Sequence, residues 1–188
     1  MKAKYFKVGD FVKINGEIWR ILKIVHTHKG RGKAEMELHL KNLKNNNFIT
    51  KIINPEEDLE ELEIEKRPIK FLYSKKDKFY FVDENNKKYE MSIEELGDKS
   101  KFIKKDLDIT GIFYENNLIN IELPIKAVYK VIYAPPGLKG DSEKSNYKIV
   151  TIETGAEISV PLFIKEGELI VINTEKGEYV ERAKENSQ

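Results

Sequence analysis

A basic segment near the N-terminus contains the residues with the clearest chemical use. Residues 26–34 have the sequence HTHKGRGKA, and no acidic residue occurs in residues 18–34. Arg31 lies between two glycines, which allow close backbone approach to a partner, and its permanent guanidinium charge suits phosphates and base edges. We expect a β-hairpin tip that contacts RNA, with Lys29 and Lys33 contacting phosphates. The alternative is a mobile basic loop without a partner.

Charge is distributed unevenly along the chain, although the formal net charge is only +1. Residues 1–54 contain 12 Lys or Arg and 4 Asp or Glu, whereas residues 55–129 carry a net charge of −5 and residues 130–188 a net charge of −2. A basic end on a nearly neutral chain predicts oriented binding to a polyanion, and the alternative is a lysine-rich face that is only solvated. Residues 55–65 contain seven acids and no base. We interpret them as a solvated acidic strand or turn against the first unit.

Composition narrows the class of protein. The chain has 188 residues, of which 40% are hydrophobic and 35% charged, which is typical of a folded, soluble protein. The absence of cysteine excludes disulfides, cysteine-type zinc sites and thiol nucleophiles. No apolar run is long enough to span a bilayer, and the first residues lack the apolar stretch of a signal peptide. We therefore expect a cytoplasmic protein without membrane contact.

Signatures of catalysis are weak. The glycines around Arg31 do not precede the Gly-Lys-Ser/Thr of a phosphate-binding loop, and no nucleophile elbow or paired acid/base carboxylates stand out. His26, His28 and His39 form only a weak metal-binding pattern without cysteine. We expect no metal, no cofactor and no enzymatic activity. An enzyme acting on a sugar or nucleotide is an alternative that a turnover assay would detect.

Alternation of apolar and polar residues predicts an all-β protein of three small units, at residues 1–65, 66–128 and 129–188. The first is expected to be an antiparallel barrel of about five short strands. A short helix is expected at 92–96, because Ser92 and Glu95 form a capping-box pattern. The expected strands are 11–14, 18–22, 34–40, 71–73, 79–82, 109–114, 118–121, 128–132, 148–152, 156–160, 168–173 and 178–182.

The aromatic residues of the second unit and the loop at residues 137–142 could each bind RNA or have only a structural role. Aromatic residues of the second unit, as in 71–73 and 79–82, could stack on nucleobases, but their strand spacing favours a place in the core. Residues 137–142 (GLKGDS) contain a carboxylate and a hydroxyl that can bond base edges or ribose, between glycines that permit unusual backbone angles. The alternative for this loop is a simple turn.

These loops, in this order, resemble those of the bacterial elongation factor P family along essentially the whole chain. The loop at 137–142 is similar to the family's Gly-Leu-Lys-Gly-Asp-Thr, and 148–167 is similar to the family signature, although Val150 replaces its usual alanine. Residues 177–182 (GEYVER) and 97–102 (GDKSKF) resemble the family's C-terminal strand and a Gly-Asp loop, and 29–34 resembles its hairpin tip.

The resemblance implies a KOW/SH3-like N-terminal barrel followed by two OB-fold barrels, in an L-shaped, tRNA-like monomer. It implies binding to the 70S ribosome and its rRNA between the P and E sites, stabilisation of P-site peptidyl-tRNA and relief of stalling at consecutive prolines. The tip Arg31 would act at the end of the tRNA, and an E-site codon of mRNA would lie near the loops of the later units. The implied contact residues are His28, Lys29, Gly30, Gly32 and Lys33 around the tip, Gly97, Asp98, Gly140, Asp141 and Ser142 in the loops, and Tyr179 and Arg182 near the C-terminus.

The tip differs from the commonest family pattern. Arg31 occupies a position that many members fill with a modified lysine, and arginine cannot undergo that chemistry. Arginine-bearing members are often rhamnosylated, but Lys29 stands where those members usually have proline. We expect either rhamnosylation of Arg31 by a rhamnosyl-transferring enzyme or an unmodified arginine. A paralogue of elongation factor P with a narrower role and a general RNA-binding module outside translation are the alternative functions.

Overall fold

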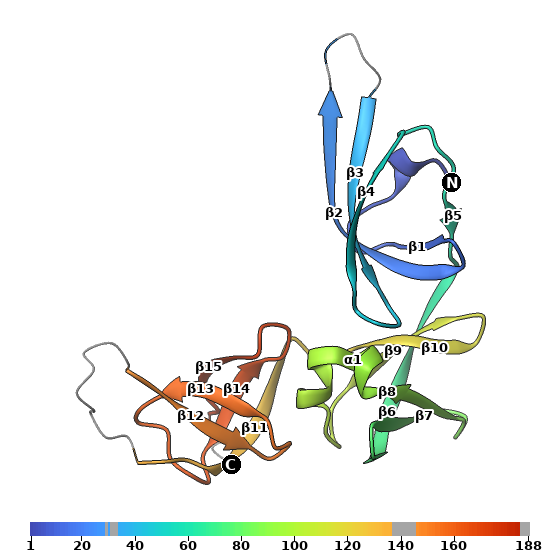
Figure 1. Cartoon of the computed structure of the whole chain (residues 1–188). Coiled ribbons are helices and arrows are strands. Elements are labelled where there is room, and N and C mark those ends of the chain that lie inside the picture. The colour runs from blue at the N-terminus through green and yellow to red at the C-terminus, as the bar shows by residue number, and fades with distance from the viewer. Residues whose placement is uncertain (29, 31–33, 137–145, 185–188) are drawn as a thin grey trace. The chain divides into compact units, whose positions relative to one another are not determined.

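The computed structural model of the chain describes residues 1–28, 30, 34–136 and 146–184. Three five-stranded sheets dominate this part of the chain, and its helical structure is limited to one short α-helix and two 3-10 segments (Figure 1). The predicted all-β class is therefore confirmed. None of the described helices has the length and apolar character needed to cross a bilayer.

The first sheet has the strand order β4-β3-β2-β1-β5. Asn15 and Gly16 have φ angles of 52° and 80° and form the two-residue turn between β1 and β2, because such a turn requires positive φ at both positions. Core side chains come from alternate positions of β3, where Met36, Leu38 and Leu40 are fully buried. The strands are β1 Phe11–Ile14, β2 Glu17–His28, β3 Ala34–Asn42, β4 Phe48–Ile53 and β5 Glu60–Glu61.

Strand β2 is longer than the sequence predicted. Leu22 is an extra residue between Ile21 and Lys23, which pair with adjacent residues of β3. This bulge interrupts the apolar alternation, so the pattern ends at Leu22 although the pairing with β3 continues to His28. The prediction of only short strands in the first unit was therefore wrong for β2.

The acidic segment lies along the N-terminus of the chain. Lys2 Nζ and Asp58 Oδ2 are 2.6 Å apart, as are Lys4 Nζ and Glu56 Oε1, and β5 pairs with β1. Residues 3–5 form a 3-10 helix, η1 (Ala3–Tyr5), which was not predicted. The interpretation of an acidic strand and turn against the first unit is confirmed. Its carboxylates therefore offset the charge of the first lysines.

The second sheet has the order β10-β9-β6-β7-β8. The predicted capping box is confirmed: Glu95 N donates to Ser92 Oγ at 3.1 Å, and Ser92 N donates to Glu95 Oε1 at 3.5 Å. Gly97, at φ 57°, ends the helix, and a 3-10 segment follows where a loop was expected. The elements are β6 Ile64–Lys75, β7 Lys78–Asp83, β8 Lys88–Ser92, α1 Ile93–Leu96, η2 Gly97–Phe102, β9 Ile109–Tyr114 and β10 Asn117–Glu122.

Aromatic residues of this sheet divide between its two faces. Phe81 and Phe113 are fully buried, which confirms the core interpretation for them. Tyr73 is 46% exposed, so the same interpretation was wrong there. Tyr73 lies at the end of β6, where the last three residues of the strand are all exposed, whereas Phe81 and Phe113 lie within their strands.

Two largely buried charged residues, Arg67 and Asp83, lie close together in the second sheet. The Arg67 guanidinium carbon lies 3.7 Å from the centroid of the Phe113 ring, and Arg67 also approaches Asp83. The Tyr89 hydroxyl donates to Asp83 Oδ2 at 3.0 Å, and the Asn85 and Lys87 backbone N–H groups donate to Asp83 Oδ1. Burial raises the pKa of Asp83, but these hydrogen bonds and the Arg67 charge outweigh it and lower the pKa below its ordinary value.

The third sheet has the order β13-β12-β11-β14-β15 and packs against Phe102, at the end of η2, and against Leu107. Tyr129 is fully buried, and its hydroxyl donates to the Phe102 carbonyl oxygen at 2.6 Å. Glu153 accepts from Lys104 Nζ at 2.9 Å and from Lys130 N at 3.0 Å. The strands are β11 Lys126–Tyr133, β12 Tyr147–Ile152, β13 Glu157–Pro161, β14 Leu169–Asn173 and β15 Glu178–Arg182.

The chain divides into two compact units. One comprises residues 1–69, 73–97 and 110–121, and thus joins the first sheet to most of the second. The other comprises residues 70–72, 98–109 and 122–188, and contains the third sheet with the segment that follows α1.

Two carboxylates predict how stability depends on pH. The pKa of Glu153 is lowered because its bonds to Lys104 and Lys130 outweigh burial, and the pKa of Asp83 is lowered as described. A carboxyl with a lowered folded-state pKa contributes stability above its unfolded pKa and loses it as the pH falls through the folded value. We expect the free energy of unfolding to decrease as the pH is lowered beneath about 4.5.

The measurement is urea unfolding between neutral and acid pH for the wild type, Asp83→Asn and Glu153→Gln. Each variant should be less stable at neutral pH and show a shallower decline in acid. An acid decline in Asp83→Asn and Glu153→Gln as steep as that of the wild type would contradict this account. Glu157→Gln, at an exposed carboxylate of β13, is the matched control.

Candidate nucleic-acid interface

Strands β2 and β3 form a ribbon that projects beyond the rest of the first sheet (Figure 1). Strand β4 pairs with β3 only as far as Met36, and β1 pairs with β2 only as far as Arg20. Beyond Met36, strands β2 and β3 continue to pair with each other as far as His28 and Ala34. The ribbon therefore leads out of the sheet to residues 29–33, the segment in which the sequence placed its tip.

The foot of the ribbon is anchored by packing, and its outer part is not. Ile21, Leu38 and Met36 are fully buried, whereas His26 and His28 are exposed. The strand pairing places His26 opposite Met36, on the core side of the ribbon but beyond the core. The apolar contacts thus hold the base while the end of the ribbon meets solvent.

The histidines do not form one site. His39 lies on the other face of the ribbon from His26 and His28, and its Nε2 is 2.7 Å from Glu37 Oε1. Strand geometry separates these faces because successive side chains alternate. Among the described residues, no group of three or more His, Cys, Asp or Glu could hold a metal ion.

A row of cations and aromatic rings crosses the outer face of the first sheet, and the sequence analysis did not single it out. Arg20 pairs with Lys41 and Lys41 pairs with Phe48, so the three side chains lie side by side. Lys41 Nζ is 5.5 Å from the centroid of the Phe48 ring, which belongs to a residue that is 68% exposed. Arg20 also lies 5.9 Å from the ring of Phe11, which is buried. The exposed Phe48 ring beside the two cations suits contact with phosphates and bases.

An apolar seam fixes the first sheet on β9 and β10 of the second, within one compact unit. Asn46, in the turn after β3, donates from Nδ2 to the Glu94 carbonyl oxygen at 2.5 Å and to that of Glu95 at 3.2 Å, at the C-terminal end of α1. A Cβ on Gly97 would lie 3.2 Å from Asn46 Nδ2, and Gly97 has positive φ. The seam residues are Phe11, Leu43, Leu62 and Ile112, with Ile18, Ile64, Tyr114 and Ile119 packed against them.

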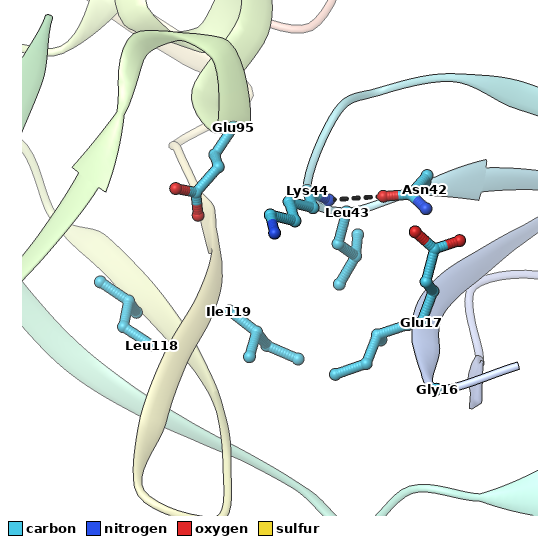
Figure 2. A pocket seen from close by; sticks show the side chains of 9 residues that line it. Gly16, Glu17, Asn42, Leu43, Lys44, Glu95, Leu118 and Ile119 are labelled. Atoms are coloured by element: carbon cyan, nitrogen blue, oxygen red, sulfur yellow. Dashed lines mark hydrogen bonds between the residues drawn. The ribbon is translucent and has the colours of Figure 1, made fainter. Parts of the chain in front are cut away.

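A cavity of about 310 Å³ lies beside this seam, and Figure 2 shows the side chains around it. Lys44 N donates to Asn42 Oδ1 at 2.8 Å on its first-sheet side. Glu95 lines it from α1, and Leu118 and Ile119 line it from β10 of the second sheet. The lining mixes charged and apolar groups, and among the described residues it contains no metal cluster, so we assign it to the seam and not to a second site.

The structure describes some of the predicted contact residues. His28 and Gly30 are exposed. Gly97 forms the end of α1, and Asp98, in the 3-10 segment, has a side chain that is 91% exposed and lies 3.1 Å from Lys101 Nζ. Lys29, Arg31, Gly32, Lys33, Gly140, Asp141 and Ser142 lie outside the described residues.

The two predicted residues of the last strand have intramolecular contacts. Tyr179 packs against the core of the third sheet, and burial raises its pKa. Arg182 Nε is 3.0 Å from Glu168 Oε2, and its guanidinium carbon lies 4.5 Å from the centroid of the Phe163 ring. Binding of RNA by Tyr179 and Arg182 stays a prediction.

Family models match three consecutive segments of the chain. The elongation factor P KOW-like domain matches residues 2–59, the elongation factor P OB domain matches 64–121, and the elongation factor P C-terminal model matches 128–182. These matches confirm the prediction of a KOW-like domain followed by an OB domain. Together with the three sheets, they define the chain as a β-domain translation factor and not an enzyme.

Relatives agree with this class. Elongation factor P from Dictyoglomus turgidum is 39% identical over 179 residues, which cover 95% of this chain and 97% of the relative. Elongation factor P from Natranaerobius thermophilus is 36% identical over 180 residues, covering 95% of this chain and 96% of that protein. This chain belongs to the elongation factor P family.

A solved structure shows the same fold at low identity. Eukaryotic translation initiation factor 5A from Methanococcus jannaschii superposes with a TM-score of 0.52 at 17% sequence identity. The match covers 66% of this chain and 90% of that one. The fold is therefore shared with a protein of low sequence identity.

The Asn46 side chain gives a prediction for the seam. Asn46→Gly keeps a residue that tolerates the observed φ of 59° but removes the donor to the carbonyl oxygens of Glu94 and Glu95. We expect a loss of about 1 kcal/mol in unfolding free energy and faster amide exchange in α1, because the helix end loses its partner. Chemical denaturation and hydrogen exchange provide the measurements.

Asn86→Gly is the matched control, since Asn86 also has positive φ, 62°, in a turn. Equal losses in both variants would mean that backbone freedom and not the hydrogen bonds determines the effect.

Proposed function

We propose that this chain binds the ribosome between the P and E sites, stabilises P-site peptidyl-tRNA and speeds peptide-bond formation at consecutive prolines. The observation that carries the proposal is the ribbon of β2 and β3, which projects from an anchored sheet and leads to the acid-free basic segment around Arg31. Membership of the elongation factor P family supports it.

The proposed mechanism is alignment. Peptide-bond formation is slow when the reacting ends are poorly positioned, and a bound protein can pay the orientation entropy before the reaction. A projecting two-stranded ribbon can enter a space that a complete sheet cannot, and the buried foot at Ile21, Met36 and Leu38 holds its base. In this proposal Arg31 contacts the end of the tRNA, and Lys29 and Lys33 contact phosphates.

The distribution of charge supports binding with the ribbon directed toward the tRNA. Residues 1–54 are strongly basic, and the acidic segment forms ion pairs with Lys2 and Lys4 of this part of the chain. Arg20 and Lys41 lie on the outer face of the sheet that bears the ribbon. Binding to tRNA phosphates through such cations should weaken as salt rises.

We further propose that the ribosome-bound chain presents the loop with Gly140, Asp141 and Ser142 to the E-site codon of mRNA. Gly97 and Asp98 belong to the second loop of this proposal, and the exposed Asp98 carboxylate can accept hydrogen bonds from ribose or bases. The chain would act as a cytoplasmic monomer. A paralogue with a narrower role would share all these contacts and differ in the stalling sequences that it relieves.

Replacement of the tip residue tests the function. Arg31→Ala should slow synthesis of a proline-run reporter by about 10-fold or more in a reconstituted translation system, because the aligning contact is lost. Its co-sedimentation with 70S ribosomes should fall much less, since other surfaces remain. Lys105→Ala, which removes an exposed cation elsewhere, is the charge-matched control.

If Arg31→Ala relieved stalling as well as the wild type, the tip mechanism would be wrong. A wild-type chain that fails to co-sediment with ribosomes at moderate salt would instead indicate a general RNA-binding module.

The modification of Arg31 is tested by the intact mass of the native protein. We propose that Arg31 is either rhamnosylated or used unmodified. A mass increase of one deoxyhexose, located on the Arg31 peptide, would establish rhamnosylation. An unshifted mass would establish that the guanidinium itself makes the contact.

A further inference from the structure

Two tyrosines form an exposed stack on the second sheet. The rings of Tyr73, on β6, and Tyr80, on β7, have centroids 4.7 Å apart and an interplanar angle of 24°. Tyr73 remains 46% exposed although Tyr80 covers one of its faces. Tyr80 is partly buried beneath it, so the near-parallel pair presents the Tyr73 ring as a surface that a third planar ring can extend.

The stack lies on the solvent side of the sheet. On β7, the neighbouring residue Phe81 is fully buried and pairs with Tyr89, whereas Tyr80 pairs with Glu90. Met91, which follows Glu90 on β8, is also buried. Alternation therefore separates a phenylalanine-lined core face from a tyrosine-bearing outer face.

Cations border the stack on this outer face. Lys75 follows Tyr73 by two residues, and Lys88 pairs with Val82, which follows Tyr80 by two residues. The acid nearest in the pairing, Glu90, is 3.2 Å from Lys78 Nζ, and this contact raises the pKa of Lys78 and neutralises the carboxylate. In the described structure, Lys75 and Lys88 have no ion-pair partner. The face around the rings is thus positive.

We propose that this tyrosine platform, made of Tyr73 and Tyr80 with Lys75 and Lys88, binds single-stranded RNA by stacking an unpaired base on Tyr73. The base would continue the Tyr80–Tyr73 stack, and the two lysines would contact the flanking phosphates. Aromatic side chains accept any base in this way, and a bordering positive charge follows the backbone. The charge complementarity favours RNA over a protein partner, and the OB-domain match of residues 64–121 agrees with it.

The platform is a second RNA contact, separate from the tip. It shares no residue with the segment around Arg31, and its existence does not depend on the proposed role of that tip. It would hold an unpaired rRNA or tRNA base against the second sheet while the ribbon acts elsewhere.

The test is fluorescence anisotropy of a labelled, short single-stranded RNA with the full chain. Tyr73→Leu and Tyr80→Leu should each weaken binding by about 10-fold, because stacking is lost while apolar volume is kept. Tyr73→Phe should bind within about twofold of the wild type, since the ring is retained. Tyr5→Leu removes a tyrosine that is 59% exposed on η1 and should leave binding unchanged.

Thermal unfolding of each variant confirms that the sheet is intact. The same loss should appear when Tyr73→Leu is combined with Arg31→Ala, which separates the platform from the tip. Unchanged affinity in both leucine variants would overturn the proposal. An equal loss of affinity in Tyr73→Phe would also overturn it, because the effect would then belong to the hydroxyl and not to the ring. A third contradicting result would be that a photoreactive group placed at Lys75 crosslinks only to ribosomal protein on the 70S particle.

Discussion

The pairing of β2 with β3 is the interaction on which the proposed function depends. An isolated two-stranded ribbon is marginally stable in water, because it has no third layer to bury an apolar face. Here the ribbon begins inside a five-stranded sheet, where Ile21, Met36 and Leu38 are fully buried. The buried foot therefore stabilises the outer part of the ribbon. The bulge at Leu22 lies within this foot, because Leu38 and Met36 pair with Ile24 and His26 beyond it.

The apolar seam attaches the first sheet, and with it the base of the ribbon, to the second sheet. Asn46 caps α1, Gly97 leaves room for it, and apolar side chains such as Phe11 and Ile112 close the contact. The ribbon is consequently fixed to a body larger than one small sheet. A factor that acts by alignment needs such a base, because orientation entropy can be paid in advance only by a stiff support.

Charged side chains are also distributed unevenly over the first two sheets. The acidic segment neutralises the first lysines through Asp58 and Glu56, and a row of cations and rings remains on the outer face of the first sheet. On the second sheet, Glu90 is paired with Lys78 beside two stacked tyrosines. Both sheets thus combine a hydrophobic inner face with an outer face suited to a polyanion.

Alternation, turn residues and charge blocks in the sequence alone determined the all-β class, the hairpins, the capped helix at Ser92 and the basic N-terminal end. These are local properties, since period-two burial, positive φ at Asn15 and Gly16, and a capping box each involve only a few neighbouring residues. The tertiary structure decided how far β2 runs, which aromatic residues face solvent and where Asn46 finds its partners. A bulge at Leu22, an outward Tyr73 and a contact between residues 46 and 94 depend on strand pairing and on packing between distant segments, which no local pattern encodes.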